Sequence, residues 1–251
     1  DDISWESYLA FLGTKTPHAA DTFRKQDVLA MSESSGQQKY AWSVYRCIYC
    51  ELTLDGADYA LNNGKWFKVN ADFLKNLDDS IKQIPSCGLI FPEYKGNDEG
   101  AYNEGVHKSN PAYFALMDKK MILHGGGHSQ IEFCDLFTTD KHLVHVKRYG
   151  GSSVLSHLFS QGTVSARLLL SDSDFRKKVN DKLPASHKLK NVSQKPKAEE
   201  FEVVYAIASN SATTSPELPL FSKINLRNSF NQLQMYGMKV SLAFIQVEPT
   251  T

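Results

Sequence analysis

The spacing of hydrophobic residues changes near residue 40, and this change gives the first part of the chain its expected layout. Residues 1–36 have apolar positions three and four apart in SWESYLAFL and ADTFRKQDVLAMSE, which predicts amphipathic helices. Residues 40–69 alternate instead, in WSVYRCIYCELTL, ADYALNN and GKWFKV. The Asp-Gly and Asn-Gly pairs between these runs favour tight hairpin turns. We therefore expect a helical start followed by a three-stranded antiparallel meander.

A polar stretch at 95–99, KGNDE, divides the chain into two expected regions. Residues 1–95 form an accessory region, and its last element is a helix predicted over 72–84. Residues 96–251 form the core, in which the spacing predicts the order α-β-β-α-β-α-β. The helices of the core are expected over 101–117 (with a break at Pro111), 154–182 and 218–236. These elements predict an α/β fold with a mixed sheet flanked by helices.

Two later segments have a clear predicted place in that sheet. FEVVYAIA at 201–208 is almost continuously apolar, which is typical of a central strand buried on both faces. KVSLAFIQV at 239–247 is expected to be an edge or near-edge strand. The segment 184–200 between the second helix and the central strand is polar, basic and without periodicity, so we expect it to be a mobile linker.

The main candidate catalytic residues lie on a hairpin expected between residues 131 and 149. Two apolar runs there are separated by the polar turn TTDK, with Asp135 near the end of the first run. His145 and Lys147 lie two residues apart in the second run, so their side chains share one face of the strand. Structure alone rarely demands an acid, an imidazole and an amine beside one hairpin. Glu132 lies three positions before Asp135 and is expected on the opposite face.

This order of elements resembles a known nuclease core. Strand–Asp–turn–strand–(Glu/Gln/His)-x-Lys–helix is similar to the PD-(D/E)xK superfamily, the fold of many restriction endonucleases. The stretch EFCDLFTTDKHLVHVKRYGGSSVLSHLFSQG resembles more closely a sporadically distributed family of uncharacterised bacterial proteins found near restriction and defence loci. This closer resemblance covers about Tyr40 to Val247. The usual glutamate of the E-x-K is His145 here, which is a departure from the nuclease pattern.

The resemblance implies a restriction endonuclease-like core and Mg²⁺-dependent (or Mn²⁺-dependent) cleavage of nucleic acid, DNA more than RNA. Hard oxygen ligands hold Mg²⁺, so Asp135 and a helical glutamate are the expected metal ligands, with His145 as a third. Glu104 is preferred as the helical glutamate, and Glu99 is the second choice. Lys147 is expected to act on the scissile phosphate, and Gln161 matches a helical glutamine of RecB-like nucleases.

Residues after the hairpin offer contacts for a phosphate backbone. Ser152 and Ser153 open a helix, where hydroxyls and exposed N–H groups bind phosphate, although both serines suit plain N-caps as well. His157 shares a helix face with Gln161, and Arg148 and Arg167 are expected backbone contacts. Residues 141–197 hold 12 Lys and Arg against 3 Asp and Glu, although the whole chain has a net charge of zero. This basic segment is consistent with a nucleic-acid footprint or with a solvated surface.

Composition limits the class of protein and its expected cellular location. A hydrophobic content of 41% over 251 residues indicates a folded protein, and no apolar run reaches the roughly 20 residues that cross a bilayer. Four scattered cysteines do not make a disulfide framework, so a cytoplasmic location is expected, and the single CxxC at Cys47 and Cys50 favours buried thiols over zinc. Because the chain opens on Asp1, we expect it to be part of a longer protein.

Two other functions stay open at this stage. The glutamate-to-histidine departure would suit an inactive core that binds nucleic acid or a partner protein. Alternatively, His145 and Lys147 would cleave RNA without a metal. A homodimer or a second defence protein is the partner to consider besides nucleic acid, and no membrane partner is expected.

Overall fold

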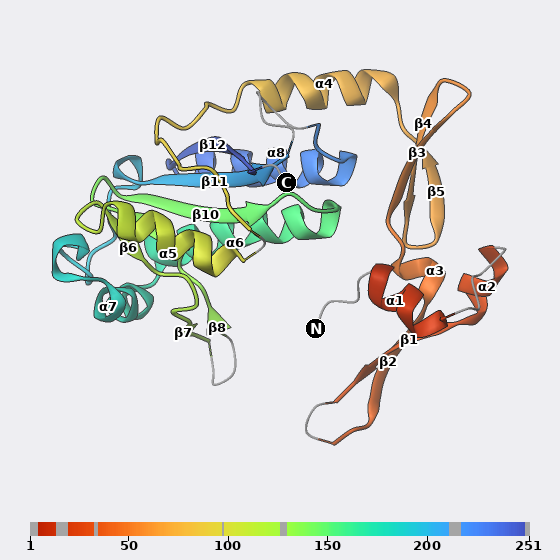
Figure 1. The fold of residues 1–251 in the computed structure, drawn as a ribbon, viewed down its shortest axis with the longest axis horizontal. Coiled ribbons are helices and arrows are strands. Elements are labelled where there is room, and N and C mark those ends of the chain that lie inside the picture. The colour runs from red at the N-terminus through yellow and green to blue at the C-terminus, as the bar shows by residue number, and fades with distance from the viewer. Residues whose placement is uncertain are drawn as a thin grey trace. The chain divides into compact units, whose positions relative to one another are not determined.

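A computed structural model describes residues 5–13, 20–32, 35–96, 98–125, 130–210 and 217–248 (Figure 1). The chain divides into two compact units, Asp1–Leu74 and Lys75–Thr251, and each is treated separately below. This division lies earlier than the polar stretch at 95–99 because the intervening residues pair with the second unit. Ser86 and Tyr94 form parallel bridges with Leu242 and Val247 there.

The first unit begins with helices α1 (Trp5–Leu12) and α2 (Ala20–Lys25). The second helix is shorter than its spacing predicts, because Asp27–Met31 forms strand β1 and pairs antiparallel with β2 (Gln38–Ser43). Val28 lies opposite Trp42 in this ladder, so cross-strand pairing replaces the expected helical turn. A short helix α3 (Val44–Cys47) then interrupts the run that the sequence marks as one strand.

The three-stranded meander is confirmed. Strands β3 (Cys50–Leu54), β4 (Ala57–Asn62) and β5 (Lys65–Lys68) form an antiparallel sheet in the order β3-β4-β5. Both turns have positive φ at each central residue: 49° and 71° at Asp55 and Gly56, and 50° and 72° at Asn63 and Gly64. This is the backbone geometry that Asp-Gly and Asn-Gly favour. Helix α4 (Ala71–Lys82) follows, close to its predicted bounds.

The second unit is built on a five-stranded mixed sheet with the order β12-β11-β10-β9-β6. Its strands are β6 (Phe114–Leu116), β9 (Leu136–Thr138), β10 (His142–Arg148), β11 (Glu202–Ser209) and β12 (Lys239–Gln246). Strands β10, β11 and β12 are parallel, whereas β9 and β6 continue the sheet antiparallel. The predicted central and edge positions of β11 and β12 are confirmed. A separate pair, β7 (Ile122–Leu123) and β8 (Gln130–Ile131), precedes β9.

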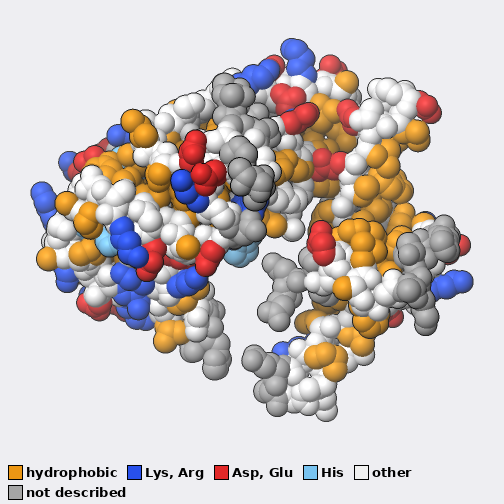
Figure 2. Space-filling model, viewed as in Figure 1, with side chains coloured by type: hydrophobic (Ala, Val, Ile, Leu, Met, Phe, Trp, Pro, Cys, Tyr) orange, Lys and Arg blue, Asp and Glu red, His pale blue; other side chains and the backbone are white. Residues whose placement is uncertain are grey.

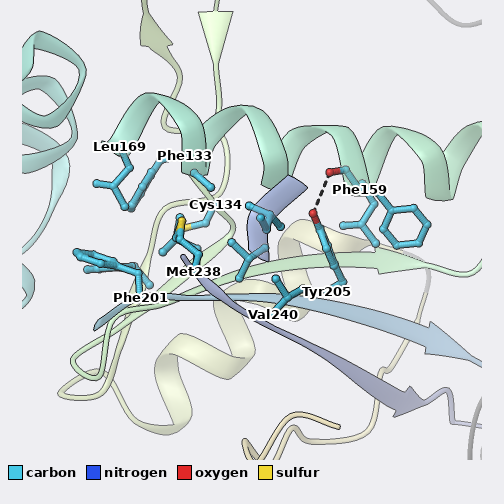
Figure 3. Close-up of a cluster of buried hydrophobic side chains, with 14 of the residues drawn as sticks. Phe133, Cys134, Phe159, Leu169, Phe201, Tyr205, Met238 and Val240 are labelled. Carbon is cyan, nitrogen blue, oxygen red and sulfur yellow. Dashed lines mark hydrogen bonds between the residues drawn. The ribbon is translucent and has the colours of Figure 1, made fainter. Parts of the chain in front are cut away.

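Helices cover both faces of this sheet (Figure 1). Helix α5 (Glu99–Ser109) packs on one face, where Tyr102 and Val106 meet Val144 and Val146. Helices α6 (Ser152–Ser171) and α8 (Leu220–Met235) pack on the other face, over the larger apolar core. Figure 3 shows part of this core, including the hydroxyl of Tyr205 donating to the carbonyl of Phe159 at 2.9 Å. The mixed α/β class is therefore as predicted.

Three local predictions in the second unit were wrong. Helix α5 ends at Ser109, and residues 114–116 of the expected helix form β6. The helix expected over 154–182 is two helices, because Asp172 ends α6 and caps α7 (Ser173–Lys182) through its side chain. The expected linker after α7 is folded, with 3-10 turns at Ala185–His187 and Ala198–Glu200.

Across the described residues, no helix is both long enough and apolar enough to cross a bilayer. All four cysteines are free thiols.

Candidate functional site

Asp135 lies where the chain enters β9, and its groups hold three segments together. Its carbonyl accepts hydrogen bonds from the amides of Met117 (2.8 Å) and Asp118 (2.9 Å). Its carboxylate Oδ2 accepts one from the amide of Val146, at 2.6 Å. Burial, and then the negative charge of Glu132, raise the pKa of Asp135 well above its ordinary value. Asp135 therefore combines a structural contact with a carboxyl group that resists ionisation.

Three carboxyl groups converge at this point. Asp118, Glu132 and Asp135 each offer an oxygen, and these oxygens lie within 4.8 Å of one another. Glu132 also accepts a hydrogen bond from the amide of Lys119 at 2.6 Å. The prediction that Glu132 faces away from Asp135 was wrong. Strand alternation does not apply between them, because β8 ends at Ile131 and β9 begins at Leu136.

Burial raises the pKa of Glu132, and the negative charge of the neighbouring Asp118 adds to the rise. The amide of Lys119 and the ammonium of Lys147 oppose this rise. Carboxyl groups whose oxygens lie within 4.8 Å of one another are stabilised by a proton or a cation between them. The carboxyl cluster of Asp118, Glu132 and Asp135 therefore favours the binding of a cation.

A lysine–glutamate pair lies beside the carboxyl cluster. The Nζ of Lys147 is 2.7 Å from Oε2 of Glu99, and both side chains are about one-third exposed. The other oxygen of Glu99 accepts the amide of Arg148 at 3.1 Å, so the carboxylate is held against the end of β10. Glu99 occupies the first turn of α5, which Asp98 caps through the amides of Gly100 and Ala101. The charge of Glu99 contributes to the raised pKa of Asp135, which ties the pair to the cluster.

Glu104, the preferred helical glutamate, is not at this site. Its carboxylate pairs with Lys108 on the exposed side of α5, at 2.9 Å. Five residues of α-helix turn a side chain by about 140°, so Glu99 and Glu104 cannot face the same point. The structure brings the second choice, Glu99, to Lys147 instead.

His145 is not in the carboxyl cluster either. Its side chain is 2% exposed on the face of β10 that α6 covers, with Nε2 3.4 Å from the hydroxyl of Ser165. Burial lowers the pKa of His145 to about 3, so the imidazole is neutral at physiological pH. Lys147 instead pairs with Glu99 of α5, the helix on the other face of the sheet, so the structure does not bring His145 and Lys147 to one point. The regular pairing of β10 with β9 ends at Val144. There the amide of Asp135, the residue before β9, donates to the carbonyl of Val144.

The remaining predicted contacts follow β10 and line α6. Gly151, and neither serine, is the N-cap of α6; Ser152 is half-buried and Ser153 is exposed. His157 is exposed and Gln161 is half-buried on the same helix, one turn apart. Arg167 lies further along α6 and lines a polar groove together with Asn225, Asn228 and Gln232 of α8. Arg148 contributes its backbone amide to Glu99.

Residues 1–246 match a family described as "Family of unknown function (DUF6119)". The chain belongs to the DUF6119 family. Searches of curated proteins and of solved structures return no match. The geometry of this DUF6119 protein is therefore the main guide to its chemistry.

The donor set of the DUF6119 site suits a hard divalent cation. Carboxylate oxygens are the ligands that Mg²⁺ and Mn²⁺ prefer, and three of them already lie close together. The cluster is partly buried, and neighbouring acidic groups add to the raised pKa of Glu132 and of Asp135, so a dication would relieve the repulsion. Asp118, Glu132 and Asp135 thus fit a Mg²⁺ or Mn²⁺ ion.

Asp118 was missed from the sequence, and Glu132 was considered but placed on the wrong face of the strand. Asp118 belongs to no motif, since it lies in the turn MDKK between β6 and β7. Backbone bonds from Met117 and Asp118 to the carbonyl of Asp135, and from Lys119 to Glu132, bring that turn to the site. For Glu132 the signal was its position three residues before Asp135. This spacing brings the two side chains to one site only where the chain is not a regular strand.

Proposed function

We propose that this DUF6119 protein is a metal-dependent nuclease that hydrolyses phosphodiester bonds, with DNA as the preferred substrate. The observation that carries the proposal is the convergence of Asp118, Glu132 and Asp135 within 4.8 Å, beside the Lys147–Glu99 pair. Acidic groups gathered next to one amine, at the rim of a sheet, match the requirements of phosphoryl transfer to water. The resemblance of the hairpin to the PD-(D/E)xK core supports the same function, and adds the expectation of a cytoplasmic bacterial defence protein.

Each group has a distinct role in this proposal. Asp118, Glu132 and Asp135 would hold Mg²⁺ or Mn²⁺, which supplies polarisation of the phosphate and activation of water when bound. Lys147 carries a positive charge next to Glu99 and faces the anionic phosphate. Glu99 fixes the lysine through one oxygen and fixes the strand end through the other. The start of α6 lies beyond the end of β10, where helix N–H groups favour a phosphate, whereas Gln161 lies midway along the helix.

His145 changes how the nuclease resemblance applies. The usual carboxylate of the E-x-K is absent, and the imidazole that replaces it is buried and neutral. Glu132 and Asp118 provide carboxylates from a different segment, so the site has its ligands without position 145. The same burial argues against the metal-independent ribonuclease, because His145 has no access to a substrate.

An inactive binding module is the second candidate, and the replacement of the usual carboxylate by His145 favours it. A core that has lost the usual carboxylate retains the Lys147–Glu99 pair and the basic segment, both of which suit nucleic acid without cleavage. It predicts binding with no Mg²⁺-dependent product.

Cleavage and metal binding test the proposal together. Supercoiled plasmid and an RNA of similar length are incubated with Mg²⁺, Mn²⁺ or EDTA. Wild type is compared with Lys147→Ala, Asp135→Asn and Glu132→Gln. We expect nicking or linearisation of plasmid in Mg²⁺ or Mn²⁺ only, and a loss of at least 100-fold in each variant. Glu104→Gln is the matched control on α5, and its rate should equal that of wild type.

Thermal unfolding provides the second arm. If the cluster binds Mg²⁺ with a Kd near 0.1 mM, 10 mM Mg²⁺ adds about 2.7 kcal/mol to the unfolding free energy. Glu132→Gln and Asp135→Asn should lose this gain, and Glu104→Gln should keep it. A Mg²⁺ gain without cleavage of either polymer would favour the inactive module, whereas no gain and no cleavage would refute the metal site.

A further inference from the structure

The segment that follows α7 is basic, yet it is anchored to the fold. The guanidinium of Arg176, which is 3% exposed, donates to the carbonyls of Val192 (2.7 Å) and Leu169 (2.9 Å). Asn180 and Leu189 exchange two hydrogen bonds, side chain to backbone, at 3.0 and 2.7 Å. The contacts to Val192 and Leu189 fix the backbone of a stretch whose composition is typical of disorder. The segment therefore holds in place the backbone positions from which its exposed side chains project.

A buried histidine anchors the same segment from the other side. His187 is 4% exposed, and its Nε2 lies 2.9 Å from the carbonyl of Tyr113, just before β6. Ala198 is buried near the far end of the segment. Between these anchors the chain has few ways to rearrange.

The anchored segment presents lysines and no acidic residue. Residues 182–197 contain five lysines and no Asp or Glu. We define the lysine surface as these five side chains, all of them exposed: Lys182, Lys188, Lys190, Lys195 and Lys197. In the described parts of the chain none of the five lies in an ion pair. Figure 2 shows Lys and Arg side chains gathered on the side where Figure 1 draws α7.

This charge pattern points to a regular polyanion. Like charges on a fixed backbone repel one another, and closely spaced phosphates relieve that repulsion by releasing counterions. Residues 182–197 contain no Phe, Trp or Tyr, so the lysine surface offers no ring for unpaired bases to stack on. Lysine is a point charge without the forked geometry that reads base edges. The surface thus suits the backbone of a duplex, without sequence readout.

We propose that the lysine surface binds the phosphate backbone of double-stranded nucleic acid. The proposal deepens the proposed function by naming a duplex as the substrate, but it does not depend on cleavage. Lys141, just before β10, forms an ion pair with Glu200, three residues after Lys197. From Lys141 to Lys147 the chain advances about 20 Å, or somewhat more than half a turn of duplex. One duplex would therefore reach both the lysine surface and the carboxyl cluster.

Binding is measured by fluorescence anisotropy in EDTA, so that cleavage plays no part. The probes are a labelled 25-base-pair DNA, a duplex RNA of the same length and the single strands. Five lysine contacts predict that log K falls with log[salt] with a slope near −4.5, so affinity drops roughly 500-fold between 50 and 200 mM salt. Lys188→Gln/Lys190→Gln/Lys195→Gln should reduce the slope by about 2.7 and leave the melting temperature unchanged.

A matched triple variant, Lys65→Gln/Lys68→Gln/Lys75→Gln, removes three exposed lysines elsewhere and should leave the slope as in wild type. An unchanged slope in the first triple variant would overturn the proposal. So would tighter binding of single strands than of duplex, or equal binding of polyglutamate, which would indicate an acidic protein partner. Duplex binding without Mg²⁺-dependent cleavage would refute the nuclease and keep the lysine surface. If the first triple variant cleaves at the rate of wild type, the lysine surface is refuted as the duplex-binding surface and the nuclease is kept.

Discussion

Gly162 allows α6 to approach β11 closely, and replacing it tests the packing that supports the site. A Cβ at this position would lie 2.6 Å from Cε1 of Tyr205 and 2.8 Å from its hydroxyl oxygen. Carbon atoms in contact prefer about 3.5–4.0 Å, so the ring must move. Tyr205 is fully buried, and its hydroxyl donates to the carbonyl of Phe159 at 2.9 Å. Movement would break that bond inside the core.

The expected loss can be estimated from these contacts. Overpacking a core usually costs about 1–3 kcal/mol, and a buried hydroxyl left without its acceptor costs about 1–3 kcal/mol more. The better helix propensity of alanine returns about 1 kcal/mol. We expect Gly162→Ala to lower the free energy of unfolding by about 3 kcal/mol, which corresponds to a fall of roughly 6–12 °C in the Tm of a protein of this size.

Urea denaturation followed by circular dichroism measures this change. Gly105→Ala is the matched control, because Gly105 also lies within a helix, α5, and a Cβ there meets no atom within 4 Å. It should stabilise the protein by about 0.5–1 kcal/mol. Equal stability of the two variants would refute the close approach of α6 and β11.

Two further outcomes follow from the titrating and anchoring residues. Since the pKa of Asp135 is raised in the folded protein, its contribution to stability is complete below the ordinary aspartate pKa and is lost as pH rises through the folded value. Metal-free Asp135→Asn should therefore gain stability relative to wild type from about pH 4 upward, measured as the difference between their urea unfolding curves; a constant difference would contradict the raised pKa. Arg176→Met should cost about 2–3 kcal/mol, because the buried carbonyl of Leu169 and the part-buried carbonyl of Val192 lose their donor, and should speed hydrogen exchange in residues 183–197. Lys177→Met, an exposed neighbour, is its control; unchanged exchange in the Arg176 variant would show that the anchor is dispensable.

Local turn chemistry made some of the fold predictable. Asn63 and Gly64 require a specific turn, so the meander followed from two residues. The continuous apolar run of β11 predicted its place inside the sheet, because a strand that is covered on both faces has apolar side chains on both. In contrast, β1 depends on pairing with β2, a partner that helical spacing cannot reveal.

The site was predictable only in part. Asp135 and Lys147 stood out because polar groups beside an apolar strand are rare. Choosing Glu104 over Glu99 failed because the start of α5 lies two residues earlier than expected, which turns a different glutamate towards Lys147. The anchored segment after α7 was missed because its hydrogen bonds come from Arg176 and Asn180, which look like surface residues in the sequence.

The bond between Asp135 and Val146 gives the protein a built-in probe. One peptide proton of β10 rests on an acidic oxygen instead of a carbonyl, so its magnetic environment follows the charge of that oxygen. The ¹⁵N–¹H resonance of Val146 would then record protonation or ion capture without any substrate present. A spectroscopist could titrate the acidic centre by watching a valine that never touches the ligand.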